Sequence, residues 1–296
     1  MPFGLAEGIL PEKRSHMRTK SIAFVAISLA LAAQAVAGGT PITTCPFVIT
    51  APGHYYLAAD LGPCTGFFAI QIASDHVRLS LEGHTLSGPV MPFGGPAPDG
   101  ISATGVQKIS IEGPGTITSF RVGIDWNDVD DSEVREVTAS GNLGGFHISG
   151  GSDNNTFREN VVSDNLEGIF VSGGSNSKFE ANIANNNSTG ITLTYGDGHK
   201  LMRNTLNGNG FRAGVSYCVG GGIHVPYSSG NEIAENTANG NCGFGIGVSP
   251  GSTQNRIIKN TALGNRELDL FDFNPNCDAN DWLQNIFVTS NQGCVQ

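Results

Sequence analysis

Residues 157–165 read FRENVVSDN, and this nine-residue pattern returns four times further along the chain. Its copies are FEANIANNN at 179–187, LMRNTLNGN at 201–209, IAENTANGN at 233–241 and IIKNTALGN at 257–265. Each copy begins with a large apolar residue and carries two Asn residues five positions apart. The copies are offset by 22, 22, 32 and 24 residues. A period near 22 is shorter than the roughly 33–47 residues of the common helical repeats, and it suits one coil of a parallel β-solenoid.

A short strand pattern follows the Asn pairs. A Gly precedes alternating residues, as in Gly168-Ile169-Phe170-Val171 and Gly222-Ile223-His224-Val225, which is typical of a half-buried strand. Stacked coils would place each strand about 4.8 Å from its copy in the next coil. Asn tolerates the left-handed backbone of a corner, and its amide can bond to the Asn above and below. We therefore interpret the Asn pairs as structural and predict an all-β parallel solenoid.

The N-terminal segment has the features of an export signal. Met17-Arg18-Thr19-Lys20 is basic, the stretch that follows it is apolar, and Ala35-Val36-Ala37 fits a cleavage site. We predict an N-terminal extension with a secretory signal peptide, the alternative being a retained N-terminal anchor. The expected division is signal segment 1–37 and a single β-helix domain 38–296, with an N-terminal cap over 38–75, coils over 76–270 and a C-terminal cap over 271–296.

The charge balance limits the classes of partner. The chain has 16 basic and 26 acidic residues, and removal of residues 1–37 takes away four basic and two acidic groups, which changes the net charge from −10 to −12. This charge opposes binding to nucleic acid and to anionic membranes. It also disfavours a polyuronate, unless Ca²⁺ bridges the two anionic surfaces. We expect a secreted or periplasmic monomer without a membrane span in the mature chain, and no cofactor apart from this calcium option.

Six Cys residues in an exported chain indicate disulfides. Six cysteines allow fifteen connectivities, and the solenoid favours pairs that are local in sequence. The predicted pairs are Cys45–Cys64, Cys218–Cys242 and Cys277–Cys294. The first and last would brace the two ends of the stack, where unpaired strand edges invite aggregation. A metal site is the alternative, but no C-x-x-C motif is present.

The N-terminal stretch PGHYYL at 52–57, the stretch VRLSLEGHTLSG at 77–88, and LDLF at 268–271 carry a family resemblance. Together with the Asn/Gly coils they resemble exported right-handed parallel β-helix proteins of the pectin-lyase-like superfamily, over roughly residues 45–296. The resemblance implies a single-stranded right-handed parallel β-helix with disulfide-braced caps. It also implies polysaccharide chemistry, by lyases, hydrolases or C5-epimerases that act on sugars in an open groove.

The family's specific catalytic motifs do not transfer to this chain. The Asp-Pro-His sequence of the epimerases is missing, and no cluster of Asp on successive coils matches the calcium site of pectate lyases. Some relatives are accessory proteins for periplasmic copper enzymes. The chain has only four Met and is not rich in His, so its composition does not support copper handling.

The residue after each Gly-apolar step should point outward, because strand side chains alternate. Down the solenoid this outward column reads Asp125, His147, Phe170, Thr192, His224, Gly247 and Asp269. A carboxylate beside an imidazole orients the ring for acid–base chemistry. We therefore predict catalytic roles for Asp125, His147 and His224, and sugar stacking by Trp126 and Phe170. The alternative is that these polar side chains are simply solvated.

The 32-residue offset marks an insertion at residues 210–221, and insertions in a solenoid form loops that are often on the binding face. We expect this loop to bring Arg212 and Tyr217 near His224. Tyr195 and Tyr227 occupy equivalent places one coil apart. We predict a catalytic role for Tyr195 and substrate binding by Arg212, Tyr217 and Tyr227; a stacking platform made by the Tyr pair and a loop without a substrate are the alternatives.

Two functions follow from these patterns. The first is an exported polysaccharide lyase or hydrolase with a groove along the outward column and the loop. The second is a non-catalytic surface or periplasmic solenoid that binds glycans or partners. The acidic charge and the missing lyase motifs favour the second function. A hydrolase would also need two carboxylates in one groove, and Asp125 with Asp128 is the only candidate pair in the sequence.

Overall fold

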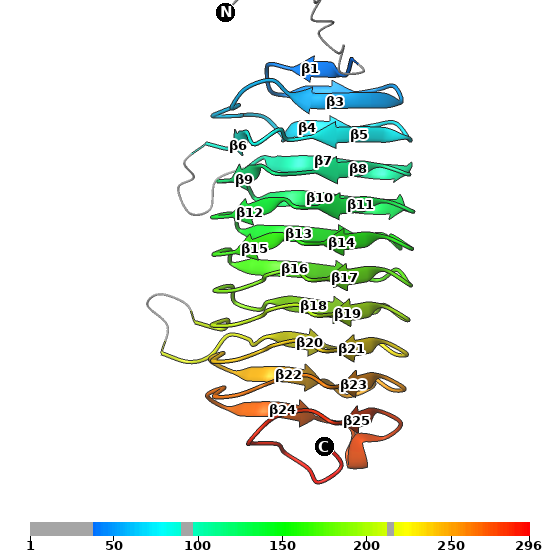
Figure 1. Cartoon of the computed structure of the whole chain (residues 1–296), viewed down its shortest axis with the longest axis vertical. Coiled ribbons are helices and arrows are strands. Elements are labelled where there is room, and N and C mark those ends of the chain that lie inside the picture. The colour runs from blue at the N-terminus through cyan, green and yellow to red at the C-terminus, as the bar shows by residue number, and fades with distance from the viewer. Residues whose placement is uncertain (1–37, 90–96, 212–215) are drawn as a thin grey trace, which may run out of the picture. The chain divides into compact units, whose positions relative to one another are not determined.

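The computed structural model describes residues 38–89, 97–211 and 216–296, and it is a right-handed parallel β-helix. The predicted signal segment and Arg212 lie outside the described residues. Figure 1 shows the described coils stacked one above another, from the blue strand β1 to the orange β25. Every strand pair within the sheets is parallel, and most coils contribute one strand to each of two long sheets.

The described residues form three sheets, named here A, B and C. Sheet A contains β1 (Thr40–Ile42), β3 (Gly53–Leu57), β5 (Val77–Ser80), β8 (Ser110–Glu112), β11 (Glu133–Arg135), β14 (Thr156–Arg158), β17 (Lys178–Glu180), β19 (Lys200–Met202), β21 (Glu232–Ala234), β23 (Arg256–Ile258) and β25 (Asp281–Leu283). Sheet B contains β2 (Phe47–Ile49), β4 (Phe68–Ile72), β7 (Asp99–Gln107), β10 (Val122–Asp130), β13 (Gly144–Ser149), β16 (Glu167–Ser172), β18 (Ile191–Thr194), β20 (Ile223–Val225), β22 (Phe244–Val248) and β24 (Leu268–Asp272). Sheet C contains β6 (Thr85–Ser87), β9 (Thr116–Thr118), β12 (Thr138–Ser140) and β15 (Val161–Ser163), and a 3₁₀ turn, η1, spans Pro275–Cys277.

The interior consists of apolar stacks that run along the solenoid. The large residue at the start of each repeat lies on its counterpart in the next coil, and all members of this stack are buried: Val134, Phe157, Phe179, Leu201, Ile233, Ile257 and Trp282. The rings of Phe157 and Phe179 are stacked, with centroids 4.9 Å apart. Each such side chain contributes roughly 1.5–3 kcal/mol by leaving water.

The Asn pairs form buried ladders, as the spacing predicts. Asn182 illustrates the bonding: its backbone N–H and Nδ2 donate to Oδ1 of Asn204 at 2.9 and 3.0 Å. Its Nδ2 also donates to the carbonyl of Phe157, and its Oδ1 accepts from the N–H of Asn160. One ladder contains Asn160, Asn182, Asn204, Asn236, Asn260 and Asn285. The other contains Asn142, Asn165, Asn187, Asn209, Asn241 and Asn265.

One detail of the corner geometry differs from the expectation. The ladder Asn residues do not adopt a left-handed backbone; the residue before each leading Asn does so, with φ of +57° at Glu159, +54° at Ala181 and +56° at Arg203. The sharp turn is therefore made one position earlier, and it aims the Asn side chain inward. Asn is therefore favoured at the ladder position for the hydrogen bonds of its amide and not for a left-handed backbone.

A third buried ladder lies at the corner between sheets B and A. It contains Asn155, Ser177, His199, Asn231, Asn255 and Asn280. Nδ1 of His199 accepts from the N–H of Ser177 at 3.2 Å, and Nε2 of His199 is buried without a partner. Burial lowers the pKa of His199, so a neutral imidazole replaces the Asn amide in this coil.

All three predicted disulfides are confirmed. Cys45–Cys64 and Cys277–Cys294 lie near the two ends of the described stack, and Cys218–Cys242 ties the inserted loop to the next coil. No cysteine of the described part is free. The division of the chain into caps and coils stays a prediction.

Asn204→Ala should lower the free energy of unfolding by about 2–5 kcal/mol, since each buried polar group left without a partner costs roughly 1–3 kcal/mol. The change leaves the backbone N–H of Asn182 without its acceptor and the carbonyl of Phe179 without its donor. Urea unfolding followed by circular dichroism measures the loss. Asn127→Ala is the matched control, because Asn127 is exposed and bonds only to the Ser149 hydroxyl. Equal losses in the two variants would contradict the ladder's role.

Candidate functional site

The outward column on sheet B exists where the sequence predicts it over most of its length. Cα pairing connects Asp125 to His147, and then in order Phe170, Thr192, His224 and Gly247. The column does not continue to Asp269, which is a correction. Gly247 pairs with Phe271, and Asp269 is buried, where it accepts from the backbone and side chain of Asn265 and ends that ladder.

A polar cluster surrounds the upper end of this column. Oδ1 of Asp125 lies 3.4 Å from Nδ1 of His147, and Oδ2 of Asp125 accepts from Arg121 at 3.0 Å. The same Nη2 atom of Arg121 donates to Oδ2 of Asp99 at 2.7 Å. Arg121 therefore joins the two carboxylates in one cluster, since both Oδ2 atoms lie within 3.0 Å of its Nη2 atom.

The two carboxylates of the cluster differ in their proton affinity. Burial raises the pKa of Asp99 above its usual range, and the hydrogen bond and charge of Arg121 offset this only in part. Burial acts on Asp125 too, but the hydrogen bonds and charges of His147 and Arg121 outweigh it and lower the pKa of Asp125. Asp125 is thus held ionised beside the imidazole. Carboxylates whose environments push their pKa values apart are the pattern of an acid and a base.

A depression of about 270 Å³ opens beside this cluster on sheet B. Its lining includes the polar side chains of Arg121, His147 and Glu167 and the exposed apolar side chains of Leu143 and Leu166. Asp99 and Asp125 do not line it, so they act on a ligand only through Arg121 and His147. The edge of Phe170 also lies against His147, with ring centroids 5.2 Å apart.

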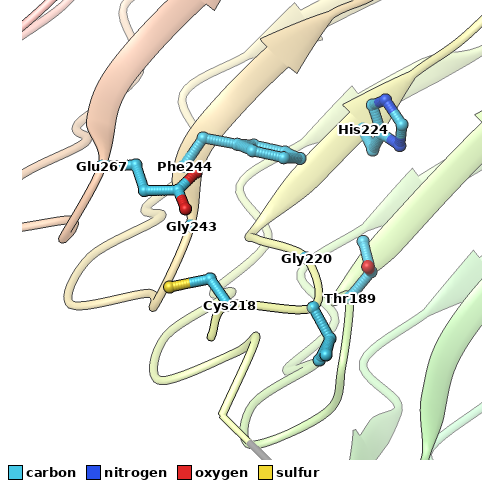
Figure 2. A pocket seen from close by; sticks show the side chains of 8 residues that line it. Thr189, Cys218, Gly220, His224, Gly243, Phe244 and Glu267 are labelled. Carbon is cyan, nitrogen blue, oxygen red and sulfur yellow. The ribbon is translucent and has the colours of Figure 1, made fainter. Parts of the chain in front are cut away.

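A second depression of similar volume lies further along the solenoid, beneath the inserted loop (Figure 2). Figure 2 shows His224 and Phe244 on adjacent strands at one side of it and the loop residues Cys218 and Gly220 at the other. Nε2 of His224 is 2.9 Å from the Ser249 hydroxyl. Burial lowers the pKa of His224, which favours the neutral ring.

The loop and the Tyr pair lie at opposite ends of the sheet B strands. The loop precedes β20 and reaches the second depression through Cys218. Tyr195 and Tyr227 lie in the turns that follow β18 and β20, and their rings are stacked. Tyr217 is 69% exposed and does not line the depression. The expectation that the loop brings Arg212 to His224 falls outside the described residues.

Trp126 cannot stack on a sugar, and this prediction was wrong. Its side chain is fully buried and packs on Phe157, with ring centroids 5.3 Å apart. The physical reason is strand alternation: Asp125 points outward, so its neighbour points inward. Phe170 is partly buried and remains beside His147 on the outer face.

Three residues of the cluster and its depression were missed by sequence reasoning: Asp99, Arg121 and Glu167. Asp99 directly follows a Pro/Gly-rich stretch and reads as part of that loop, yet it begins β7 and is buried. The sequence did contain a signal for Arg121. This residue stands four positions before Asp125, at the start of the same strand region, so an ion pair between the two could have been predicted.

The parallel strand pairings define a right-handed parallel β-helix protein, and solved structures share this fold. A family model described as periplasmic copper-binding protein (NosD) matches residues 87–284, and the chain belongs to this family. A comparison with curated protein sequences gave no match. The periplasmic family and the three disulfides agree with export. The described part of the chain contains no helix with the length and apolarity needed to cross a bilayer.

Solved structures with this fold include a double mutant of the periplasmic alginate epimerase AlgG, at 16% identity and a TM-score of 0.58, covering 77% of this chain and 66% of that one. A single mutant of AlgG matches at 14% identity and a TM-score of 0.54, covering 84% and 75%. The Dettilon tailspike protein matches at 15% identity and a TM-score of 0.58, covering 83% of this chain and 53% of that one. At these identities the likeness establishes the fold alone.

The family's description names copper, but the described residues do not fit a copper site. Copper sites use thiolate, thioether and imidazole ligands. All six cysteines are in disulfides, Met202 is the one methionine in the described ranges, and those ranges contain no group of three His, Cys, Asp or Glu side chains that could hold a metal ion. The same holds for the acidic turn around Asp128, which offers calcium no group of three carboxylates within the described part.

Arg121→Ala should reduce the free energy of unfolding by about 1–3 kcal/mol at pH 7, because it leaves Asp99 buried without a cation; the partial exposure of Arg121 keeps this below the full cost of breaking a buried pair. The folded-state pKa of Asp99 is raised, so lowering the pH protonates Asp99 and relieves the cost. The loss should therefore be smaller at pH 4 than at pH 7.

Urea unfolding at the two pH values measures both effects. Arg256→Ala is the matched control, since the Arg256–Glu232 pair is solvated and should change stability by roughly 0–1 kcal/mol at either pH. A loss at pH 4 that equals or exceeds the loss at pH 7 would show that the cost of removing Arg121 does not come from an ionised, buried Asp99.

Proposed function

We propose that this exported protein binds a polysaccharide across the outer face of sheet B and that His147, oriented by Asp125, carries out acid–base chemistry on it. The observation that carries the proposal is the hydrogen-bonded chain from Asp99 through Arg121 and Asp125 to His147, set at the rim of a depression. His147 and Glu167 are the titratable groups that line this depression together, and a general acid or base must be within reach of the reacting atom.

The electrostatics favour a neutral polysaccharide over a polyuronate. Arg121 is the cation of the depression, but Asp99 and Asp125 already neutralise it. Glu167 adds a further negative charge to the lining. A uronate carboxylate would therefore meet no free positive charge there, and the whole chain is acidic.

The comparisons support a polysaccharide as the substrate class. AlgG is by its printed name an alginate epimerase, so this fold supports chemistry on a polysaccharide in at least one relative. Exposed apolar side chains beside polar groups, as at Leu143 and Leu166, are the usual composition of a saccharide or small-molecule site. His224 and the second depression would extend the same binding face along the solenoid, while Arg212 and Tyr217 would contribute from the loop.

A non-catalytic glycan-binding solenoid is the second candidate. It is favoured by one observation: both carboxylates of the cluster are engaged by Arg121 and neither lines the depression. In that case the His147–Asp125 pair only orders the surface. The two candidates differ in whether product is formed.

His147→Ala should reduce the rate of product formation by about 100-fold or more, since general acid–base catalysis contributes roughly 10²–10⁴-fold. The assay incubates the mature protein with neutral polysaccharides and with polyuronates, with and without calcium, and detects reducing ends and unsaturated ends. Asp125→Asn should lower the rate less, because it keeps the ring in place but loses the charge.

His84→Ala is the matched control, because His84 also pairs with an aspartate, Asp60, at 3.3 Å, but far from the depression. It should leave the rate unchanged. Undiminished product in the His147→Ala variant would refute the assigned role. Binding without product from the wild-type protein would establish the second candidate.

A further inference from the structure

Tyr195 and Tyr227 form an exposed aromatic pair at the edge of the solenoid. Their ring centroids are 5.3 Å apart and their planes are nearly parallel, at 7°. Their exposed fractions are 66% and 58%, so both rings remain largely in water. Neither ring adds to the apolar core.

The backbone of both tyrosines is left-handed, with φ of +55° at Tyr195 and +52° at Tyr227. This conformation costs an L-residue roughly 1–2 kcal/mol, and a bulky residue rarely adopts it. In the four preceding coils the same turn position, also with positive φ, holds residues suited to it: Gly105, Asp128, Gly150 and Gly173.

Glycine or Asp at this turn position would therefore be less strained, yet two successive coils have Tyr there. The two rings pack on each other but not on the core, and both are largely solvated. Gly173 precedes Tyr195 in the column, and the exposed Pro250 follows Tyr227 at the same turn position. Gly251, beside Pro250, lies against Tyr227, where an added Cβ would be 3.6 Å from Cδ1 of that ring. The exposed fractions of the two tyrosines leave both rings accessible to a ligand.

The charges along this edge restrict the ligand. Asp130, Asp153 and Asp197 lie in turns of the same edge, and each uses one carboxylate oxygen to accept a backbone N–H from a later coil. They give the edge a negative character that disfavours anionic ligands. The faces of aromatic rings carry negative partial charge and attract weakly positive C–H groups, which the apolar face of a neutral sugar ring presents.

We propose that Tyr195 and Tyr227 form a stacking platform for a neutral saccharide chain, separate from the depression at His147. A sugar ring packs on the exposed surface of the paired rings. The pair lies three residues beyond Thr192 and His224 along their strands, roughly 10 Å from the outward column. The platform needs only binding, so it does not depend on the acid–base role proposed for His147.

Affinity electrophoresis in gels that contain dextran, a mixed-linkage β-glucan or a galactomannan tests this proposal. The wild-type protein should be retarded by at least one of these neutral polysaccharides. The double variant Tyr195→Gly/Tyr227→Gly should bind about tenfold more weakly or worse. It should melt no lower than the wild type, because glycine suits the left-handed turn.

Three control variants test whether the retardation belongs to these two rings. The variant Tyr195→Phe/Tyr227→Phe keeps both rings and should keep the retardation. Phe67→Ala removes another exposed ring, 90% exposed, and should have no effect. Arg256→Ala changes an exposed residue of sheet A and should be retarded like the wild type.

The proposal is wrong if no neutral polysaccharide retards the wild-type protein, or if the glycine variant is retarded equally. A change in oligomeric state of the glycine variant on size exclusion, without any glycan binding by the wild type, would assign the pair to a contact between protein copies and would also overturn the proposal.

Discussion

The structure depends on how a narrow solenoid satisfies the polar backbone at its buried corners. A chain that turns sharply in every coil brings N–H and C=O groups out of water where no strand partner reaches them, and each unpaired group costs free energy comparable to a lost hydrogen bond. The Asn side chain solves this with one acceptor and two donors: Nδ2 of Asn182, for example, donates to the carbonyl of Phe157 and to Oδ1 of Asn204. Coil length and strand register follow from this repeat, because a slipped coil would break every bond of the ladder.

The same ladder explains how far the fold and the site could be read from the sequence. The spacing of the Asn pairs sets the register, so the pairing of Asp125 with His147 and of Thr192 with His224 could be predicted without coordinates. The prediction failed at Asp269 because it placed the last member of the column 22 residues after Gly247, whereas the last two Asn copies are 24 residues apart, which is the distance from Gly247 to Phe271. A carboxylate takes over the acceptor role from the next Asn, which pulls Asp269 inward and leaves Phe271 in the outward column.

The rest of the site could not be predicted for a different physical reason. Periodicity determines which Cα atoms lie side by side along the solenoid axis, but Asp99 and Arg121 meet diagonally, through a long side chain that reaches a neighbouring coil. Such contacts depend on side-chain rotamers and on the length of the segment before β7, and neither leaves a periodic trace. Asp99 and Arg121 occupy positions that carry no repeat signature, which is why composition and spacing indicated a column of single residues and not a connected network.

The division between ladder and outer face also explains how the chain can belong to a family described as copper-binding while its described residues offer no copper site. The inward positions, ladder Asn and stacked apolar residues, are tied to their copies in adjacent coils and specify the fold. The outward positions contact mainly solvent and their immediate neighbours, so they can change without cost to the coil. Membership in the family therefore indicates that the chain has the inward pattern of ladder Asn and apolar residues. It does not indicate that the chain has metal-ligand side chains on its outer face. Tyr195 and Tyr227 differ from the other outward positions, because they occupy a turn position that holds glycine in most of the preceding coils. A side chain that is kept despite an unfavourable backbone conformation indicates a function outside the fold itself. At this edge the two tyrosines provide an exposed aromatic surface.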